Sequence, residues 1–220
     1  MAFHNKEIWE KICRVFLATK ELTIKIEEIN DEHKAFLQPV NELKSALDHI
    51  IRVQAAELNL CEIVESSQYI KSNLDKTLGH MYRAFFDAAD YFSLILREKI
   101  LKVLQKYSSD TIHKVITDYY SHKKVFIENL NDEIVVIRLN KDIGNEANIL
   151  PSIDEYSLKL KDLYAIYRDI EIKIPQLDEL YTIEKRKKSG RTRLAIAGII
   201  FGIIGLIGTI FTILSFLKML

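Results

Sequence analysis

The sequence has few of the residues that end or interrupt helices, with only 7 glycines and 3 prolines among 220 residues. A sandwich or barrel of β-strands needs a turn every ~8–12 residues, and glycine and proline supply many of those turns. Their scarcity therefore argues against an all-β fold. Hydrophobic residues make up 48% of the chain, which excludes a sequence too polar to fold. We expect an all-α protein.

Paired cysteines and an excess of one charge are also missing. Cys13 and Cys61 are the only cysteines, so the sequence offers no disulfide framework and is typical of a reducing compartment. The 31 lysines and arginines balance 31 aspartates and glutamates. This balance argues against a protein that binds polyanions over its whole surface, but it allows a local basic patch.

Motifs of known catalytic chemistry are absent as well. The sequence has no glycine-rich phosphate loop, no Gly-x-Ser-x-Gly, no His-Glu-x-x-His and no Cys/His set at metal-ligand spacing. We therefore expect no cofactor, no metal site and no enzymatic activity.

Hydrophobic residues at i, i+3 and i+4 predict an antiparallel bundle of long helices. The expected helices cover 5–29, a second stretch from near Pro39 to Leu58, and about 68–106, 110–141 and 153–174. The run Ser108-Ser109-Asp110 offers the expected N-cap of the fourth helix, and Ser152 with Glu155 forms an expected capping box for the fifth. Pro175 is expected to kink or briefly break the chain before a further helical stretch.

The C-terminal part of the sequence is different, because residues 194–217 contain no charged residue. A helix of that length spans about 36 Å, enough to cross a bilayer core with some tilt. The segment lies too late in the chain to be a signal peptide. We expect one C-terminal transmembrane helix in a single-pass, tail-anchored protein.

Basic residues precede this segment and indicate its orientation. Under the positive-inside rule they keep the N-terminal part in the cytoplasm, and they contact anionic headgroups. The expected organisation is a cytoplasmic bundle over 1–183, a basic juxtamembrane segment over 184–193 and a transmembrane helix over 194–217. The basic residues are Lys185, Arg186, Lys187, Lys188, Arg191 and Arg193.

Small residues form a stripe along the expected transmembrane helix at alternating steps of three and four. Such a stripe lets helices approach closely, as in the motif formed by Gly198 and Gly202. Helix–helix association is the functional interpretation, and a ring of such helices could expose threonine hydroxyls to a pore. A plain lipid anchor is the alternative. The stripe comprises Ala195, Gly198, Gly202, Gly205, Thr209 and Thr212, with Gly208 one position to its side.

Two His-x-x-Arg motifs occur in the middle of the second and third expected helices. His49 and Arg52 share one helix face, as do His80 and Arg83. One interpretation is a polar pocket between these helices that binds phosphate or a partner. The other is a set of intrahelical ion pairs, Asp48 with Arg52 and Arg83 with Asp87, that orient two packed helices.

The stretches 41–53 (NELKSALDHIIRV) and 78–96 (LGHMYRAFFDAADYFSLIL) resemble the paired helices of HEPN-like bundles, over about residues 35–130. Together with a membrane segment, the chain is similar to accessory membrane effectors of bacterial CRISPR and anti-phage systems. This resemblance implies oligomeric pores and membrane depolarisation at the inner (cytoplasmic) membrane of a bacterium. HEPN ribonucleases carry Arg followed by His after four to six residues, and no arginine of this sequence is followed by histidine at that spacing. The ribonuclease pair is therefore missing.

The sequence thus predicts a non-enzymatic membrane effector whose partners are the lipid bilayer and further copies of the chain. An unidentified cytoplasmic protein or RNA is the expected trigger. Two alternatives remain: a membrane-tethered, divergent ribonuclease using the four His and Arg residues, and a tail-anchored adaptor that localises a cytoplasmic partner.

Overall fold

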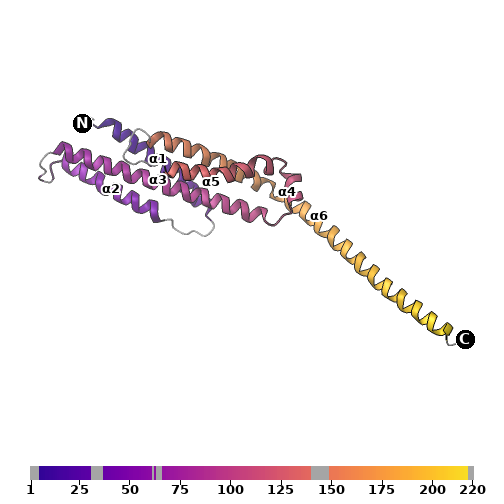
Figure 1. Ribbon diagram of the computed structural model, residues 1–220. Helices are drawn as coiled ribbons and strands as arrows, with labels where there is room; N and C mark the ends of the chain where they lie inside the picture. Colours follow the sequence, from indigo (N-terminus) through magenta and orange to yellow (C-terminus); the bar gives the residue numbers. More distant parts are fainter. Residues whose placement is uncertain (1–4, 31–36, 61, 63–65, 140–148, 218–220) are drawn as a thin grey trace.

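The computed structural model describes residues 5–30, 37–60, 62, 66–139 and 149–217 (Figure 1). Within these ranges the chain forms helices and no strand, which confirms the all-α class. The elements are α1 (Lys6–Ile29), α2 (Leu37–Glu57), α3 (Ser66–Leu104), α4 (Ser109–Val115), the π-helix η1 (Tyr119–Lys123), α5 (Lys124–Leu139) and α6 (Ile149–Leu217).

Helix α3 is the centre of the bundle, because α1, α2 and α6 all pack against it. A helix surrounded in this way has to be apolar on most of its faces. Accordingly, Phe85, Phe86 and Phe92 are completely or almost completely buried. The ring of Tyr156 on α6 lies 5.7 Å from that of Phe86, and its hydroxyl donates a hydrogen bond of 2.7 Å to Asp90. Aromatic packing and one polar contact therefore join α6 to the central helix.

The first three helices agree closely with the sequence prediction, whereas the fourth differs. The expected single helix over 110–141 is divided into α4, η1 and α5. Within the run 108–110 that offered an N-cap, Ser108 is the residue that caps α4, because its side-chain oxygen accepts a hydrogen bond from the Thr111 amide. The helix ends because Ile116 has an extended-like φ of −122° and ψ of 78°, with its side chain fully buried. Burial of this side chain against the rest of the bundle is a tertiary effect that the local pattern did not reveal.

Two expectations for the last helix were wrong. Ser152 and Glu155 do not form a capping box, because α6 begins at Ile149 and both residues lie inside it. The short break expected as one alternative at Pro175 does not occur, since this residue lies within the same helix of 69 residues. The other alternative, a kink at Pro175, stays a prediction. Proline removes one backbone hydrogen bond. Burial of Ile170 and Leu177 on either side holds the helix against the bundle across that position.

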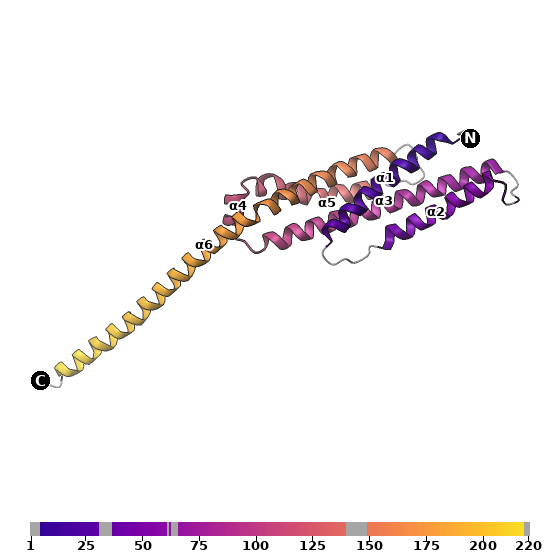
Figure 2. The same ribbon diagram turned by 180° about the vertical axis from the view of Figure 1, so that it is seen from behind.

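Helix α6 has two environments along its length. Its N-terminal part packs on the bundle, and its C-terminal part projects alone from one end, as Figures 1 and 2 show. A helix of 69 residues is about 100 Å long. Among its described side chains, Leu177 is the last buried one. Over the residues that the structure describes, no helix offers a stretch long and apolar enough to cross a membrane.

Candidate functional site

The structure brings the two His-x-x-Arg motifs together at the interface of α2 and α3. The rings of His49 and His80 stack with their centroids 5.4 Å apart and an angle of 22° between their planes. This proximity depends on how α2 lies against α3, which the spacing within each motif does not determine. It makes the two histidines one cluster rather than two separate features.

Glu42 completes this cluster, and the sequence analysis did not identify it. Its Oε2 atom accepts a hydrogen bond of 2.9 Å from Nε of Arg83 and lies 2.8 Å from Nδ1 of His80. Nη2 of Arg83 is 2.7 Å from the same imidazole nitrogen. That nitrogen either donates a hydrogen bond to Glu42 or accepts one from Arg83, depending on the tautomer of His80. The sequence did contain a signal for Glu42, since this residue precedes His49 by seven positions. Seven positions are two helical turns, so both side chains lie on the same face of α2.

The electrostatics of the cluster are set by Glu42. Partial burial alone would raise the pKa of its carboxyl group. The hydrogen bonds from His80 and Arg83, and their charges, outweigh burial and lower that pKa below its ordinary value of 4.5. Glu42 is therefore ionised at neutral pH and pairs with the Arg83 guanidinium.

The other members of the motifs also have structural partners. Arg52 pairs with Asp48 at 2.8 Å, as predicted, with both side chains more than half exposed. Nδ1 of His49 lies 2.9 Å from the side-chain oxygen of Asn73, whose amide nitrogen donates to the Tyr69 carbonyl.

Both arginines therefore have a carboxylate partner within the protein. The pairing of Arg83 with Asp87 stays a prediction. We call the contacts of Glu42 with His80 and Arg83 the α2–α3 clasp. The arrangement supports a structural role, in which the clasp holds α2 on α3, rather than an anion-binding pocket. Within the described ranges, no three His, Cys, Asp or Glu side chains group as metal ligands would.

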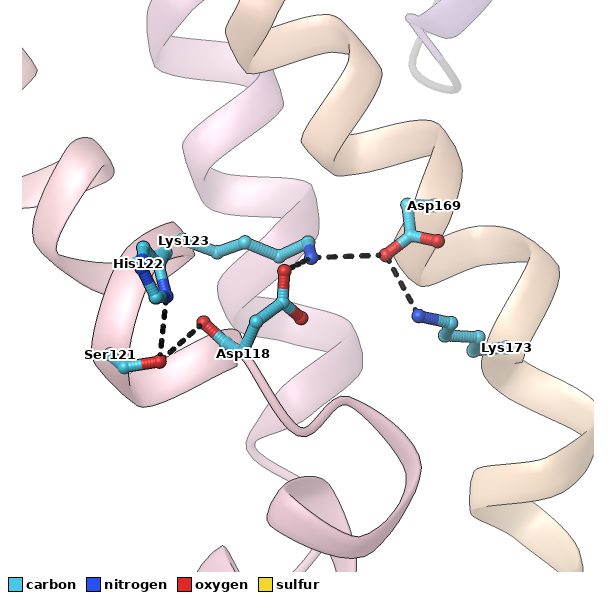
Figure 3. A network of polar contacts seen from close by, with 6 residues as sticks. All are labelled: Asp118, Ser121, His122, Lys123, Asp169 and Lys173. Atoms are coloured by element: carbon cyan, nitrogen blue, oxygen red, sulfur yellow. Dashed lines mark hydrogen bonds and ion pairs between the residues drawn. The ribbon is translucent and has the colours of Figure 1, made fainter.

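A second polar network joins η1 to α6 (Figure 3). Lys123 is only 14% exposed and lies between two carboxylates. It pairs with Asp118 and, at 3.4 Å, with Asp169, which also accepts a hydrogen bond of 3.1 Å from Lys173. The hydrogen bond from Lys123 lowers the pKa of Asp118. π-Helices often occur at functional sites, but here the charges are mutually neutralised and fix α6 against the bundle.

A third set of contacts surrounds the point where α6 leaves the bundle. We call it the collar, and it consists of Tyr107, Ser108, Asp178, Tyr181 and Glu184. The Tyr107 hydroxyl donates a hydrogen bond of 2.8 Å to Asp178, and its ring packs edge-to-face on Tyr181. Ser108 donates to Glu184 at 3.2 Å. The hydrogen bond from Tyr107 lowers the pKa of Asp178, which keeps its carboxylate charged. The last residue of the collar, Glu184, is the first residue of the predicted basic segment.

The buried face of α6 follows a repeat of seven residues. From Ile153 to Ile170 its buried positions are separated by alternating steps of three and four, as in coiled coils, and a full step of seven then leads to Leu177. The same steps, continued beyond the collar, arrive at the predicted small-residue stripe, since three repeats of seven lead from Leu177 to Gly198. The buried positions are Ile153, Tyr156, Leu160, Leu163, Tyr167, Ile170 and Leu177.

The stripe itself lies on the projecting part of α6. At Gly198, Gly202 and Gly205 an added Cβ atom would meet no heavy atom within 4 Å. A single chain therefore gives no steric reason for glycine at these positions. The predictions for Ala195, Gly208, Thr209 and Thr212 concern side chains outside the described residues.

The predicted basic segment is part of the same helix. The side chains of Lys185, Arg186, Lys187 and Lys188 are exposed. Those of Arg191 and Arg193 lie outside the described residues. The structure thus puts four basic side chains on the surface of α6 just beyond the collar.

Comparisons with known proteins add no relative. A scan against protein-family models returns no match for this chain, and neither a search of curated proteins nor one of solved structures finds a similar protein. The resemblance to HEPN-like bundles and the expected transmembrane helix stay predictions.

Proposed function

We propose that this chain is an oligomeric membrane effector, anchored by residues 194–217 and forming or gating a pore there. The observation that carries the proposal is the projecting end of α6, where described apolar side chains face solvent. Leu194 is 75% exposed, Phe201 73% and Leu206 65%. Large contiguous apolar surfaces are typical of contacts with lipid or with other proteins. The absence of charge over 24 residues favours lipid.

Self-association is supported by the register of α6. The positions that bury apolar side chains in the bundle and those that carry glycine near the C-terminus belong to one seven-residue pattern. Glycines at such spacing allow the backbones of neighbouring helices to approach closely. Because the glycines have open space around them in one chain, a second copy is the partner that explains them.

The bundle is the controlling part in this proposal. Its collar and the network around Lys123 hold α6 as a rigid extension of the cytoplasmic bundle. A trigger that shifts the bundle would therefore move the whole projecting helix. The four exposed basic residues after the collar, Lys185 to Lys188, would lie at the level of anionic headgroups. An anti-phage setting, with a cytoplasmic protein or RNA as trigger, follows from the resemblance to HEPN-like bundles.

The divergent ribonuclease is not proposed, because the two arginines that such a site would use are paired with carboxylates. Arg83 pairs with Glu42, and Arg52 pairs with Asp48. The tail-anchored adaptor remains the competing explanation of the projecting helix. It differs in one respect, because an adaptor needs only hydrophobicity at the glycine positions.

Leakage of a dye from liposomes separates the pore from the adaptor. Purified full-length protein is compared with a variant in which Gly198, Gly202 and Gly205 are all changed to Leu. We expect the variant to insert equally well but to lose most of the leakage, because Leu side chains keep the helices apart.

The matched control changes Ile199, Phe201 and Ile203 to Leu, which leaves the glycines in place and the segment apolar. This control should leak like the wild type. Equal leakage from the glycine variant and the control, or no leakage from any of the three proteins, would contradict the proposed pore.

A further inference from the structure

An apolar groove runs between α1 and α2, above the central helix α3. Its volume is about 560 Å³ and ten residues line it. Eight of these ten are apolar, and the other two are Cys13 and Lys44. The floor of the groove is part of the hydrophobic core, where Ile12 is 3% exposed and Met81 is 6% exposed. The walls include side chains open to solvent, among them Phe16 and Leu47.

The size of the groove suits a small molecule better than a protein. Pockets for small ligands have volumes of roughly 300–1,000 Å³ and are mostly apolar with a few polar groups. A stable protein interface involves about 20–30 residues on each side. Ten lining residues are therefore too few for a second copy of the chain or a partner helix.

The groove is also elongated. On α2 it extends from Val40 to Ile50, which is about 15 Å at 1.5 Å per residue. On α1 it extends from Trp9 to Phe16, about 10 Å by the same rise. An elongated apolar groove favours an unbranched hydrocarbon chain over a compact ring system.

Lys44 gives the groove a single charged wall group. It lies one turn of α2 after Val40 and six residues before Ile50, between the two ends of the groove. Among the described residues Lys44 forms no ion pair, whereas Asp48, one turn further along α2, pairs with Arg52. The lysine stem can line the apolar wall while the ammonium group stays at the rim. Its charge is complementary to a carboxylate at the end of a hydrocarbon chain.

We infer that the groove between α1 and α2 binds a free long-chain fatty acid, with the acyl chain between the helices and the carboxylate at Lys44. The inference does not depend on the proposed pore, because every residue that carries it belongs to α1, α2 or α3.

Trp9 makes the groove directly observable, because it is the only tryptophan of the chain and lines the groove. The probe is cis-parinaric acid, a polyene fatty acid that absorbs tryptophan emission, added to the full chain in lipid nanodiscs. We expect saturable quenching of Trp9 with one probe per chain, and displacement of the probe by unlabelled palmitate.

Two variants locate the probe. Leu47→Asp places a carboxylate on the groove wall at a side chain that is already 56% exposed, so the fold should tolerate it. It should weaken binding about tenfold or more. The matched control Leu101→Asp changes a side chain that is 66% exposed but does not line the groove. This control should bind like the wild type.

Lys44→Met tests the carboxylate contact. It should weaken binding of the fatty acid about two- to fivefold, as expected for an exposed ion pair, and leave binding of the corresponding fatty alcohol unchanged. Three results would overturn the inference: no saturable quenching, equal quenching in Leu47→Asp and Leu101→Asp, or a change of oligomer size in Leu47→Asp without any quenching. The last result would assign the groove to a second copy of the chain.

Discussion

Glu42 offers the sharpest test of the α2–α3 clasp, because one carboxylate holds two side chains of the neighbouring helix. The change Glu42→Gln keeps the shape of the side chain and removes its charge. We expect the bundle to lose stability, since Arg83 is left without a charged acceptor and His80 without a charged partner.

The size of the loss follows from burial and distance. A hydrogen bond to a charged group contributes about 1.5–3 kcal/mol when well formed. The Glu42 side chain is 25% exposed and that of Arg83 37%, so solvent weakens the pair. We therefore expect Glu42→Gln to lower the free energy of unfolding by about 1.5 kcal/mol. The control Asp48→Asn removes a pair more than half exposed on both sides and should cost about 0.3–0.5 kcal/mol.

The pH dependence of the free energy of unfolding provides a second test of the Glu42 charge. Because the folded-state pKa of Glu42 is lowered below 4.5, its charge stabilises the fold above that pH. The stabilisation is lost as the pH falls through the lowered pKa. The difference between wild type and Glu42→Gln should therefore be full at neutral pH and shrink below pH 4.5.

Urea unfolding followed by Trp9 fluorescence measures these differences, because Trp9 packs against the bundle core. A loss for Glu42→Gln no larger than that for Asp48→Asn would refute the clasp. A difference that stays constant as the pH falls well below 4.5 would refute the role of the Glu42 charge.

Three further substitutions probe the packing of α4 and α6 by the same unfolding measurement. Tyr156→Phe removes the hydrogen bond to Asp90 and should lower the free energy of unfolding by about 0.5–1.5 kcal/mol; no change would contradict the assigned contact. Ser108→Ala removes the N-cap of the Thr111 amide and should cost about 1 kcal/mol, and a neutral result would mean that α4 does not depend on its cap. Pro175→Ala restores a backbone hydrogen bond within α6 and should raise the free energy of unfolding by about 1–3 kcal/mol. Destabilisation by this change would show that a bend at Pro175 is needed.

The long periodic segments could be predicted from the sequence, whereas their interruptions could not. Helices α1 and α3 begin and end within about two residues of the expected bounds, because their apolar periodicity is strong. The end of α4 depends instead on the burial of Ile116 in the core. The continuity of α6 through Pro175 depends on packing on both sides of the proline. Both are interactions between distant parts of the chain.

The candidate site could also be predicted only in part, because some of its contacts join different helices. The shared faces of His49 with Arg52 and of His80 with Arg83 follow from helical spacing alone. The contact between the two histidines and the role of Glu42 depend on how α2 lies against α3, which spacing within one helix does not determine. The groove beside Lys44 likewise arises from the separation of α1 and α2 and has no sequence motif.

Insertion of the C-terminal part of α6 into a bilayer is the central claim, and flotation with liposomes at high salt tests it most directly. High salt would screen an attraction of the basic residues 185–188 to anionic headgroups but would not weaken the burial of an apolar helix. We expect the full chain to float at high salt. We expect a variant carrying Ile203→Lys and Leu206→Lys to remain at the bottom of the density gradient. Each lysine near the bilayer centre raises the free energy of insertion by about 3 kcal/mol. The control variant carrying Leu101→Lys and Ile172→Lys, two exposed bundle positions, should float like the wild type. A chain that floats only at low salt, or that floats equally with lysines at 203 and 206, would contradict the account.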